Sequence, residues 1–345
     1  MSESVWVTGS GIAAHACARL LRRANVRVCL KREQGWQSPV VLLSSVTQRL
    51  LHDVFEDPQL FTGVHPIRKR VVRWGGTEAH TLAIPHMGVA VAESELLSRI
   101  GPTVADRQPE KEDEPTWTIA CSRTFPERSR RHFGERTACA FPVVLSRECD
   151  AESCYVESVS NGWLFLLPFS RTEASLLCVG AQAGVELLER SQLVARQIST
   201  CGSKTSSFRA HPSILDGLAS LGRIACGAAA VSFDPLCGEG MGNAIREAIL
   251  ASAVVRASLS GGRVDDLILH YKSCLLGGFL RHLETCEAFY SSGPQDDWWQ
   301  TEQLRIRDGI DWVRQRLPDQ PFRFRLSGFD LEEMDLERPT AGAFA

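Results

Sequence analysis

The segment spanning residues 4–30 constrains the fold more than any other part of the chain. It begins with a short apolar run, Val5–Thr8, and continues with the small-residue stretch Gly9–Ala14. A helical pattern then runs to Asn25, which is expected to stop the helix, and Val26–Leu30 has the pattern of a second strand. A strand, a glycine-bearing turn, a helix and a strand in this order predict a βαβ unit of the dinucleotide-binding kind.

The small residues of this turn have separate predicted roles in holding a dinucleotide. Gly9 permits the tight turn, Gly11 lets the backbone approach a pyrophosphate, and Ala14 lets the helix pack closely on the strand. The N–H groups of Ile12 and Ala13, at the positive end of the helix dipole, are expected to face the phosphates. The alternative is a chance glycine turn, which the flanking strands and helix disfavour.

The composition is that of a globular protein of one or two domains, with 345 residues, of which 44% are hydrophobic and 23% charged. A net charge of −3 disfavours a surface for nucleic acid or anionic membranes, so no nucleic-acid partner is expected. The N-terminus enters an apolar strand without a basic leader, and no apolar run reaches ~18 residues. These features predict no membrane span and a cytoplasmic location.

Twelve cysteines are many for a chain expected in a reducing compartment. Cys149 and Cys154 are close in sequence, but no CxxC pair and no cysteine–histidine quartet has zinc-site spacing. Others, including Cys29, Cys178 and Cys226, lie in apolar runs, where a thiol behaves as a small hydrophobe. The sequence therefore predicts no metal site.

Strand patterns dominate the middle of the chain. Residues 64–86 alternate like a hairpin around Gly75-Gly76. Four further strand patterns predict an antiparallel sheet distinct from the nucleotide-binding sheet: Cys139–Leu145, Cys154–Ser158, Trp163–Pro168 and Ala174–Gly180. Helical patterns cover residues 39–61, 93–100, 185–200 and 242–258, and most of the chain from there to residue 317.

A second glycine-rich loop lies between a buried strand pattern ending at Cys226-Gly227 and the helix pattern that starts near Met241. Pro235 fixes the direction of the chain in this loop. Gly238, Gly240 and Gly242 allow its backbone to approach a flat ligand. The helix start directs N–H groups at a partly negative atom, so the loop predicts a second ligand contact far from the first.

Together these motifs resemble those of the para-hydroxybenzoate-hydroxylase-type flavoproteins, which include the flavin halogenases. Gly9–Ala14 is similar to the first FAD fingerprint of that superfamily, and Gly227–Gly240 is similar to the second, G-D-A-A followed by P-x-x-G-x-G. Gly162–Pro168 resembles a strand of the substrate sheet. The segment Trp117–Arg123, with Ser129, occupies the place of the motif between the two fingerprints.

The resemblance implies an α/β fold: a Rossmann-type FAD domain with an inserted antiparallel-sheet substrate domain and a helical C-terminal region. The implied FAD-binding domain is discontinuous (residues 1–60, 90–137 and 205–260), the substrate sheet covers 61–89 and 138–204, and the helical region covers 261–345. The implied FAD contacts are Gly9, Gly11, Ile12, Ala13, Ala14, Lys31, Arg123, Ala228, Asp234, Pro235, Gly238, Gly240, Met241, Gly242 and Asn243. No catalytic acid or base is identified.

Three positions depart from the superfamily pattern. Lys31 replaces the acidic residue that holds the adenosine ribose, with Glu33 two residues later. Ala228 replaces the aspartate that meets the ribityl chain, and Cys121–Arg123 replaces an Asp-Gly pair. Each lost hydrogen bond costs ~1 kcal/mol, so two such losses are expected to weaken FAD binding by roughly ten-fold to a few hundred-fold.

The implied activity is that of an FAD-dependent monooxygenase acting on an aromatic small molecule or on an aromatic side chain of a partner protein. NAD(P)H or a separate reductase would supply the electrons. Phe165 stands where the halogenases have the second tryptophan of W-x-W-x-I-P, which disfavours halogenation. The Gly162–Pro168 strand and Trp298-Trp299 are similar to the group that hydroxylates tryptophan in a partner oxidase to build its tryptophylquinone cofactor.

Three other functions remain open. The altered fingerprint positions suit a scaffold that keeps the fold and acts by binding a partner. The stretch from Pro235 to Gly240 also resembles geranylgeranyl reductases, in which the flavin reduces an isoprenoid double bond. Lys31-Arg32 suits the 2′-phosphate of NADP in a simple dehydrogenase, although such an enzyme does not explain the Pro235–Asn243 loop.

Overall fold

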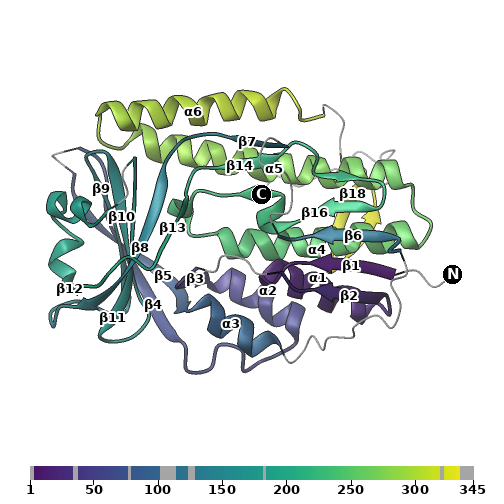
Figure 1. Cartoon of the computed structure of the whole chain (residues 1–345), viewed down its shortest axis with the longest axis horizontal. Coiled ribbons are helices and arrows are strands. Elements are labelled where there is room, and N and C mark those ends of the chain that lie inside the picture. Colours follow the sequence, from purple (N-terminus) through teal and green to yellow (C-terminus); the bar gives the residue numbers. More distant parts are fainter. Residues whose placement is uncertain are drawn as a thin grey trace, which may run out of the picture.

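In the computed structural model the chain has two sheet-based parts with long helices beside them (Figure 1). The structure describes residues 4–33, 38–76, 79–101, 114–122, 129–181, 184–318 and 322–334. The smaller sheet, near the N-terminus, lies on the right in Figure 1 and the larger sheet on the left, while α5 (Val264–Ser291) and α6 (Asp297–Arg314) run along the top. This arrangement is the α/β fold that the sequence predicts.

The smaller sheet has the strand order β15-β16-β6-β1-β2. Its strands are β1 (Ser4–Thr8), β2 (Arg27–Lys31), β6 (Trp117–Ala120), β15 (Ala219–Ser220) and β16 (Arg223–Ala225). All of its pairs are parallel except β15–β16. Helix α1 (Ile12–Arg23) connects β1 to β2, and Asn25 follows it in the left-handed conformation, with φ of 59°. The predicted βαβ unit and its stop at Asn25 are confirmed.

The larger sheet has the strand order β12-β8-β11-β10-β9-β4-β5-β3, and β13 also pairs with β8. Its strands are β3 (Val41–Ser44), β4 (His65–Arg73), β5 (Thr81–Val91), β8 (Thr137–Leu145), β9 (Ser153–Val159), β10 (Gly162–Pro168), β11 (Glu173–Gly180), β12 (Ile198–Cys201) and β13 (Ser206–Arg209). The predicted antiparallel pairing of β8 to β11 is confirmed. One pair, β4–β9, is parallel, so the sheet as a whole is mixed.

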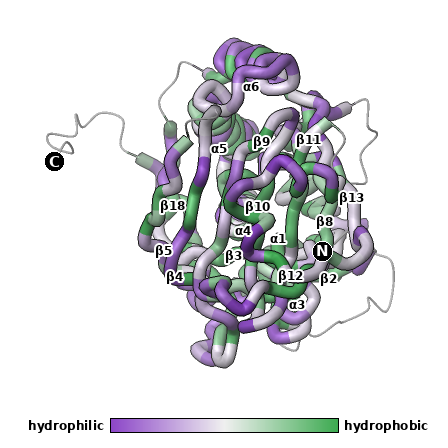
Figure 2. Tube along the Cα trace, turned by 90° about the vertical axis from the view of Figure 1, so that its left-hand side faces the viewer, coloured by the Kyte–Doolittle hydropathy of each residue, from purple (hydrophilic) through white to green (hydrophobic). Residues whose placement is uncertain are grey.

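Within the described residues, five α-helices follow or flank these sheets in addition to α1. They are α2 (Ser45–Phe55), α3 (Glu93–Ile100), α4 (Gly240–Leu259), α5 and α6. Helix α4 packs against α1, and α6 packs along α5 with the side chain of Asp296 capping its first turn through the Trp299 N–H. Figure 2 shows α6 as largely hydrophilic. Its buried residues form a narrow stripe that includes the apolar Ile306 and Val313 and the charged Glu302.

The prediction of a helix over residues 185–200 is wrong. The segment instead forms two short 3-10 turns, η3 (Val185–Arg190) and η4 (Ala195–Gln197), and enters strand β12. The cause is the buried carboxylate of Glu157 on β9, which accepts backbone N–H groups at 2.7–3.0 Å from Gln192, Leu193 and Val194. Because N–H groups bonded to a carboxylate cannot bond to helical carbonyls, this tertiary contact overrides the local helical pattern.

The helix predicted over residues 39–61 is shorter than expected. Its first part is the apolar strand β3, and the helix begins only after Ser44, whose hydroxyl accepts the Thr47 N–H at 3.3 Å. It ends at Glu56, which is in the left-handed conformation with φ of 55°. The β-branched and leucine run before Ser44 fits a strand better than a helix.

The region from residue 261 onward is helical only as far as α6. It continues into a hairpin of β18 (Phe324–Ser327) and β19 (Asp330–Glu333) that returns to α4. Arg256 on α4 forms an ion pair with Asp330 at 2.5 Å and donates to the Phe329 carbonyl. Strands β3 and β13, which the sequence assigns to the FAD-binding domain, pair within the larger sheet. The exact division into domains stays a prediction.

A third, small sheet contains β7 (Arg130–His132), β14 (Ser213–Leu215) and β17 (Val231–Ser232). It joins the second glycine loop to the core, because β17 lies within that loop. Within the part of the chain that the structure describes, no helix is both long and apolar enough to cross a membrane.

Candidate functional site

The first glycine loop has the geometry that its sequence predicts. Gly9 has φ of 122°, and a Cβ there would lie 3.2 Å from the Ser122 backbone nitrogen, so both conformation and space require glycine. Gly11 occupies the N-cap of α1 and faces open space, since a Cβ there would meet no atom within 4 Å. Among the described residues no side chain caps this helix, so its first N–H groups, including those of Ile12 and Ala13, remain for a ligand.

Residues Ala13 and Ala14 on the first turn of α1 are buried and allow close packing. The loop itself is held by the Gly9 N–H, which donates to the Lys31 carbonyl at 2.9 Å and thereby joins the end of β2. His15 also closes on the loop, with its Nδ1 3.0 Å from the Gly11 carbonyl oxygen. The loop is therefore fixed on its inner side and open on its outer side at Gly11.

The end of β2 carries a lysine where the superfamily has a carboxylate, and the structure shows two consequences. The Lys31 ammonium lies over the Trp6 ring, 3.2 Å from its centroid, in a cation–π contact. Glu33 lies beside the loop instead: its carboxylate accepts the Ser122 hydroxyl, and its backbone carbonyl accepts the Ser10 hydroxyl at 2.5 Å. A carboxylate is thus present next to the phosphate loop, two residues after the expected position.

The second glycine loop meets the first through Gly227. This residue begins the short turn η5 (Gly227–Ala229) with φ of 59°, and a Cβ there would lie 2.9 Å from the Ala13 Cβ. Its N–H donates at 2.8 Å to the buried carboxylate of Glu247 on α4. Burial raises the pKa of Glu247 to about 8. Gly227 therefore brings the starts of both motifs together at α1.

Ala228 lies at the exposed outer side of the η5 turn. Arg130 on β7 donates to the carbonyls of Ala228, at 3.0 Å, and of Ala229. These two bonds fix the loop backbone at the position where the superfamily pattern has an aspartate. Arg123, a predicted cofactor contact, lies outside the described residues.

At the start of α4 one glycine is tightly packed against another helix and another glycine faces open space. Gly238 has φ of 67°, and Gly242 lies against α2, where a Cβ would be 2.6 Å from the Thr47 hydroxyl. Gly240, between them, is exposed and would place a Cβ in open space. Met241 and Asn243 are half-buried beside it. Among the described residues no side chain caps α4, so its N-terminus, like that of α1, is available to a ligand.

The other end of this loop is closed by a buried charged network. Asp234, 2% exposed, accepts bonds from Arg136 Nε at 2.7 Å and from the Tyr290 hydroxyl at 3.0 Å. Arg136 also pairs with Glu302 on α6 at 2.5 Å, and the Trp163 indole N–H donates to the Tyr290 hydroxyl. Burial alone would lower the pKa of Arg136, but its neighbours, Tyr290 and the two carboxylates, raise it, so the guanidinium stays charged.

Asp234 has a structural role in this arrangement. Its second carboxylate oxygen accepts the Leu236 N–H at 2.8 Å and caps the turn η6 (Pro235–Cys237). Its backbone N–H donates to His282 Nε2 on α5, also at 2.8 Å. Because both carboxylate oxygens are engaged within the protein, Asp234 holds the loop in place, and Pro235 begins the turn that directs the chain to Gly238.

Two surface depressions lie away from both loops. One is lined by α5 residues that include Arg281, Glu284 and Phe289, and the other lies between α2, α4 and the terminal hairpin. Neither contains a residue of either glycine loop, so neither is the predicted nucleotide site.

Several contributors to this site could not be identified from sequence spacing. Each of five residues lies 20 or more positions in sequence from the loop residue that it contacts: Glu33, Arg130, Arg136, Glu247 and Tyr290. Glu33 had a detectable signal, since it is the first carboxylate after the altered position at Lys31. The others carry no local pattern, and only the pairing of strands and helices brings them to the loops.

Solved structures with the same architecture are flavoenzymes. The flavin-dependent halogenase CmlS superposes with a TM-score of 0.74 at 13% identity, over 95% of this chain and 74% of that one. The peptidyl tryptophan dihydroxylase QhpG, essential for tryptophylquinone cofactor biogenesis, gives 0.71 at 17% identity, over 97% and 86%. PqsL, a probable FAD-dependent monooxygenase from Pseudomonas aeruginosa, gives 0.63 at 16% identity, over 91% and 99%. No protein-family model matches the sequence, and no curated protein matches it.

The chain has the fold of the flavin-dependent halogenases and monooxygenases. The resemblance seen in the fingerprints is therefore confirmed at the level of the fold, along with the Rossmann-type unit, the substrate-type sheet and the C-terminal helices. Identities of 13–17% establish architecture and leave cofactor and reaction to the site itself.

Proposed function

We propose that the protein binds FAD and is a flavin-dependent oxidoreductase. One observation carries the proposal: both glycine loops present an uncapped helix N-terminus beside a glycine that faces open space, Gly11 on α1 and Gly240 on α4. A dinucleotide with a flat ring system needs two such contacts, one for its pyrophosphate and one for the partly negative edge of the ring. The shared fold of FAD-dependent halogenases and monooxygenases supports the same assignment.

Different residues around the two loops would bind different parts of FAD. The N–H groups of Gly11 and Ile12 would take the pyrophosphate, and the start of α4 at Gly240–Gly242 would take the ring. Glu33 is the carboxylate placed to accept a ribose hydroxyl in place of the residue lost at Lys31. Arg130 and Asp234 would act indirectly, by fixing the backbone of the second loop.

We assign the reaction to hydroxylation of an aromatic group. The chemistry that FAD supplies when bound is two-electron transfer and activation of dioxygen. Phe165, in place of the second halogenase tryptophan, and Trp163, whose N–H is used by Tyr290, support hydroxylation over halogenation. The electron donor would be NAD(P)H or a separate reductase.

For the substrate we favour an aromatic side chain presented by a partner protein. The segment Thr81–Met87 of β5 supports this, because β3 pairs only with Gly88–Val91 and leaves the rest of that edge uncovered by the described strands. Its side chains Leu82 and Met87 are 62% and 75% exposed. An exposed apolar sheet edge is typical of a protein-binding surface. QhpG, which shares the fold, acts on a peptidyl tryptophan.

A second function is favoured by a different observation. Lys31 and Ala228 remove two side chains that the superfamily uses for hydroxyl groups of FAD, which suits a scaffold that has kept the fold and acts only by binding a partner. The same exposed edge of β5 would serve such a scaffold. The two functions differ in a single property, the retention of flavin.

The absorption spectrum of the purified chain, before and after addition of FAD and gel filtration, tests the proposal. We expect flavin bands in the visible region that remain with the protein. Gly11→Val should abolish them, whereas Gly217→Val, at a second glycine with open space but outside both loops, should not. A folded protein that retains no flavin at millimolar FAD would overturn the proposal in favour of the scaffold.

The substrate assignment needs a separate measurement on flavin-loaded protein. Chemically reduced protein is mixed with oxygenated buffer containing either free tryptophan or a tryptophan-rich unfolded protein, and the products are analysed by mass spectrometry. We expect one added oxygen atom on the protein substrate. Leu82→Ser should reduce this yield, and Leu221→Ser, at a 78% exposed leucine on the β15–β16 turn, should leave it unchanged. Oxidation of free tryptophan alone would contradict the assignment.

A further inference from the structure

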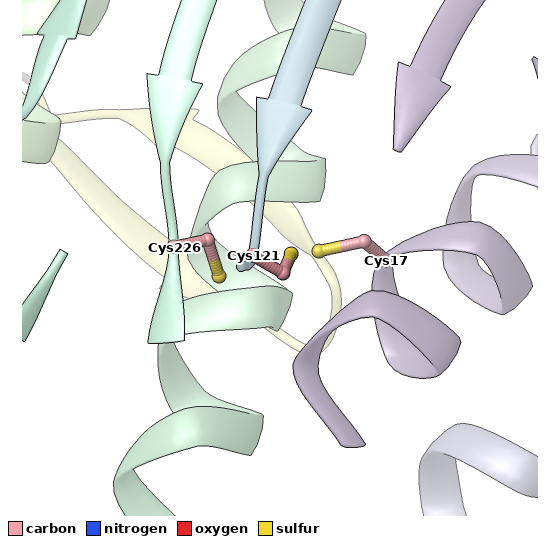
Figure 3. A group of neighbouring side chains, drawn as sticks. All are labelled: Cys17, Cys121 and Cys226. Atoms are coloured by element: carbon pink, nitrogen blue, oxygen red, sulfur yellow. The ribbon is translucent and has the colours of Figure 1, made fainter. Parts of the chain in front are cut away.

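Three cysteines that are far apart in sequence meet inside the smaller sheet. Cys121 and Cys226 are the first residues after β6 and β16, which pair in parallel with Ala120 opposite Ala225. The Cys226 N–H donates to the Ala120 carbonyl at 2.8 Å, so the two cysteines lie side by side at the carboxyl edge of the sheet. Cys17, on the buried face of α1, points at them, and Figure 3 shows the three sulfur atoms turned toward one another.

The cluster is enclosed and reduced. Cys17 and Cys226 are fully buried, Cys121 is 9% exposed, and all three are free thiols. Ser252 on α4 is 1% exposed, and its hydroxyl lies beside the Cys17 thiol. That hydroxyl makes no hydrogen bond of ordinary geometry among the described residues. A buried hydroxyl without a regular partner normally needs an explanation, because desolvation of such a group costs about 1–3 kcal/mol.

The spacing of the sulfur atoms suits one bound ion. All three lie within 4.8 Å of one another. Sulfur ligands about 2.3 Å from a central ion are separated by roughly 3.8–4.0 Å in tetrahedral or trigonal geometry. That separation lies within the 4.8 Å limit that the three sulfur atoms satisfy. An iron–sulfur cluster, whose ligand sulfurs must span several iron atoms, does not fit this spacing.

The chemistry of the ligand set favours a soft metal ion. The cluster offers three thiols, and each thiol that ligates a metal loses its proton to solvent. Thiolate ligands select soft ions such as Cu(I) over hard ions such as Mg²⁺ and Ca²⁺.

We propose that Cys17, Cys121 and Cys226 form a binding site for one Cu(I) ion. Cu(I) is soft, prefers thiolate ligands and needs no fourth donor, whereas zinc in proteins is nearly always four-coordinate. The cluster lies directly behind the two glycine loops, since a Cβ at Gly9 would be 3.3 Å from the Cys121 Cβ and Cys226 directly precedes Gly227.

The chain contains a second group of soft ligands, Cys237, His282 and Cys286, which is a poorer site. His282 Nε2 already accepts the Asp234 N–H at 2.8 Å, so a metal there would break a bond that holds the second loop. Cys237 is also half-exposed, in contrast to the enclosed thiols of the first cluster. A Cys237→Ser parent protein removes this group from the measurement.

The test is anaerobic transfer of copper from the Cu(I)–bicinchoninate complex to the full-length Cys237→Ser protein. The decrease in the absorbance of that complex measures the amount of copper transferred. We expect one equivalent of Cu(I) to be transferred. Adding Cys17→Ser, Cys121→Ser or Cys226→Ser should weaken the transfer at least tenfold. Cys178→Ser, at a fully buried cysteine of the larger sheet outside the cluster, should leave it unchanged.

A measurement without further substitutions keeps the proposal testable if a serine variant does not fold. X-ray absorption at the copper edge of the loaded Cys237→Ser protein should show three sulfur neighbours at about 2.3 Å. Transfer that is equally strong in all three serine variants, a sulfur count of one or none, or binding of Zn(II) in preference to Cu(I) at equal concentration would each overturn it. None of these readouts depends on flavin, so they are independent of the proposed function.

Discussion

The two ends of the second glycine loop differ in what fixes them. At the Asp234 end, charged and aromatic side chains from α5, α6 and the larger sheet form a fully buried network around Arg136. At the Gly240 end, six residues later, the backbone faces open space and the helix N-terminus has no side-chain cap among the described residues. The loop is therefore anchored where it leaves the scaffold and free where a ligand would approach.

The difference shows how side chains outside the loop can fix the position of its backbone while the side that would face a ligand stays open. A ligand contact made of backbone N–H groups needs an exact position, which the loop's own glycines cannot supply because glycine restricts the backbone least. The buried network supplies that position from outside the loop, through the capped turn at Pro235–Cys237. A site of this kind combines rigid support with an accessible first contact.

Removing the central cation of the network should produce the largest effect. Arg136→Met leaves Asp234 and Glu302 buried without a partner, so we expect the free energy of unfolding to fall by about 3–5 kcal/mol. Urea denaturation followed by circular dichroism measures it. Arg68→Met, which breaks an exposed pair with Glu152, should cost less than about 1 kcal/mol. Equal losses in the two variants would mean that the network does not anchor the fold.

A larger side chain at the open end of the loop should weaken FAD binding and leave the stability of the fold nearly unchanged. Gly240→Val places a branched side chain where the backbone would meet the flavin, and we expect FAD affinity to fall about ten- to hundred-fold. Because a Cβ at Gly240 meets no protein atom, thermal stability without FAD should change little. Titration of flavin fluorescence measures the affinity. Undiminished flavin content in the folded variant would remove Gly240 from the site.

The pH dependence of stability should reveal the carboxyl group that links the two loops. The pKa of Glu247 is raised by burial from 4.5 to about 8, so the folded chain keeps a proton that the unfolded chain releases. The free energy of unfolding should therefore fall as pH rises from about 5 to 8. Glu247→Gln, which retains an acceptor for the Gly227 N–H, should reduce this decrease in the free energy of unfolding. Parallel pH profiles for the variant and the original protein would contradict this assignment.

The smallest expected effect concerns the adenosine end of the cofactor. Lys31→Glu restores the carboxylate of the superfamily pattern and should tighten FAD binding by up to about tenfold. Glu33→Gln should weaken it by a similar factor if Glu33 has taken over the ribose contact. Fluorescence titration of both variants compares the two positions. Weaker binding in Lys31→Glu with no change in Glu33→Gln would show that the ribose is held in another way.

The sequence by itself determined the features that depend on neighbouring residues. The glycine spacing at residues 9–14 and 238–242 predicted the two turns, because tight turns and close approaches restrict residue type locally. Short, largely apolar runs predicted the strands β8 to β11 for the same reason. The order of these motifs was enough to predict the flavoenzyme-type fold that the structural neighbours share.

Only the tertiary structure decided which distant residues meet. The Glu157 carboxylate turned a helical pattern at residues 185–200 into 3-10 turns and a strand. The parallel pairing of β6 with β16 brought Cys121 beside Cys226, although no spacing in the sequence suggested a cluster. Arg136, too, has no motif of its own, and its importance comes from the two buried carboxylates around it. Local sequence patterns reflect the conformational restrictions on the backbone within a few residues. Burial, charge pairing and ligand geometry depend instead on contacts that form only when the chain has folded.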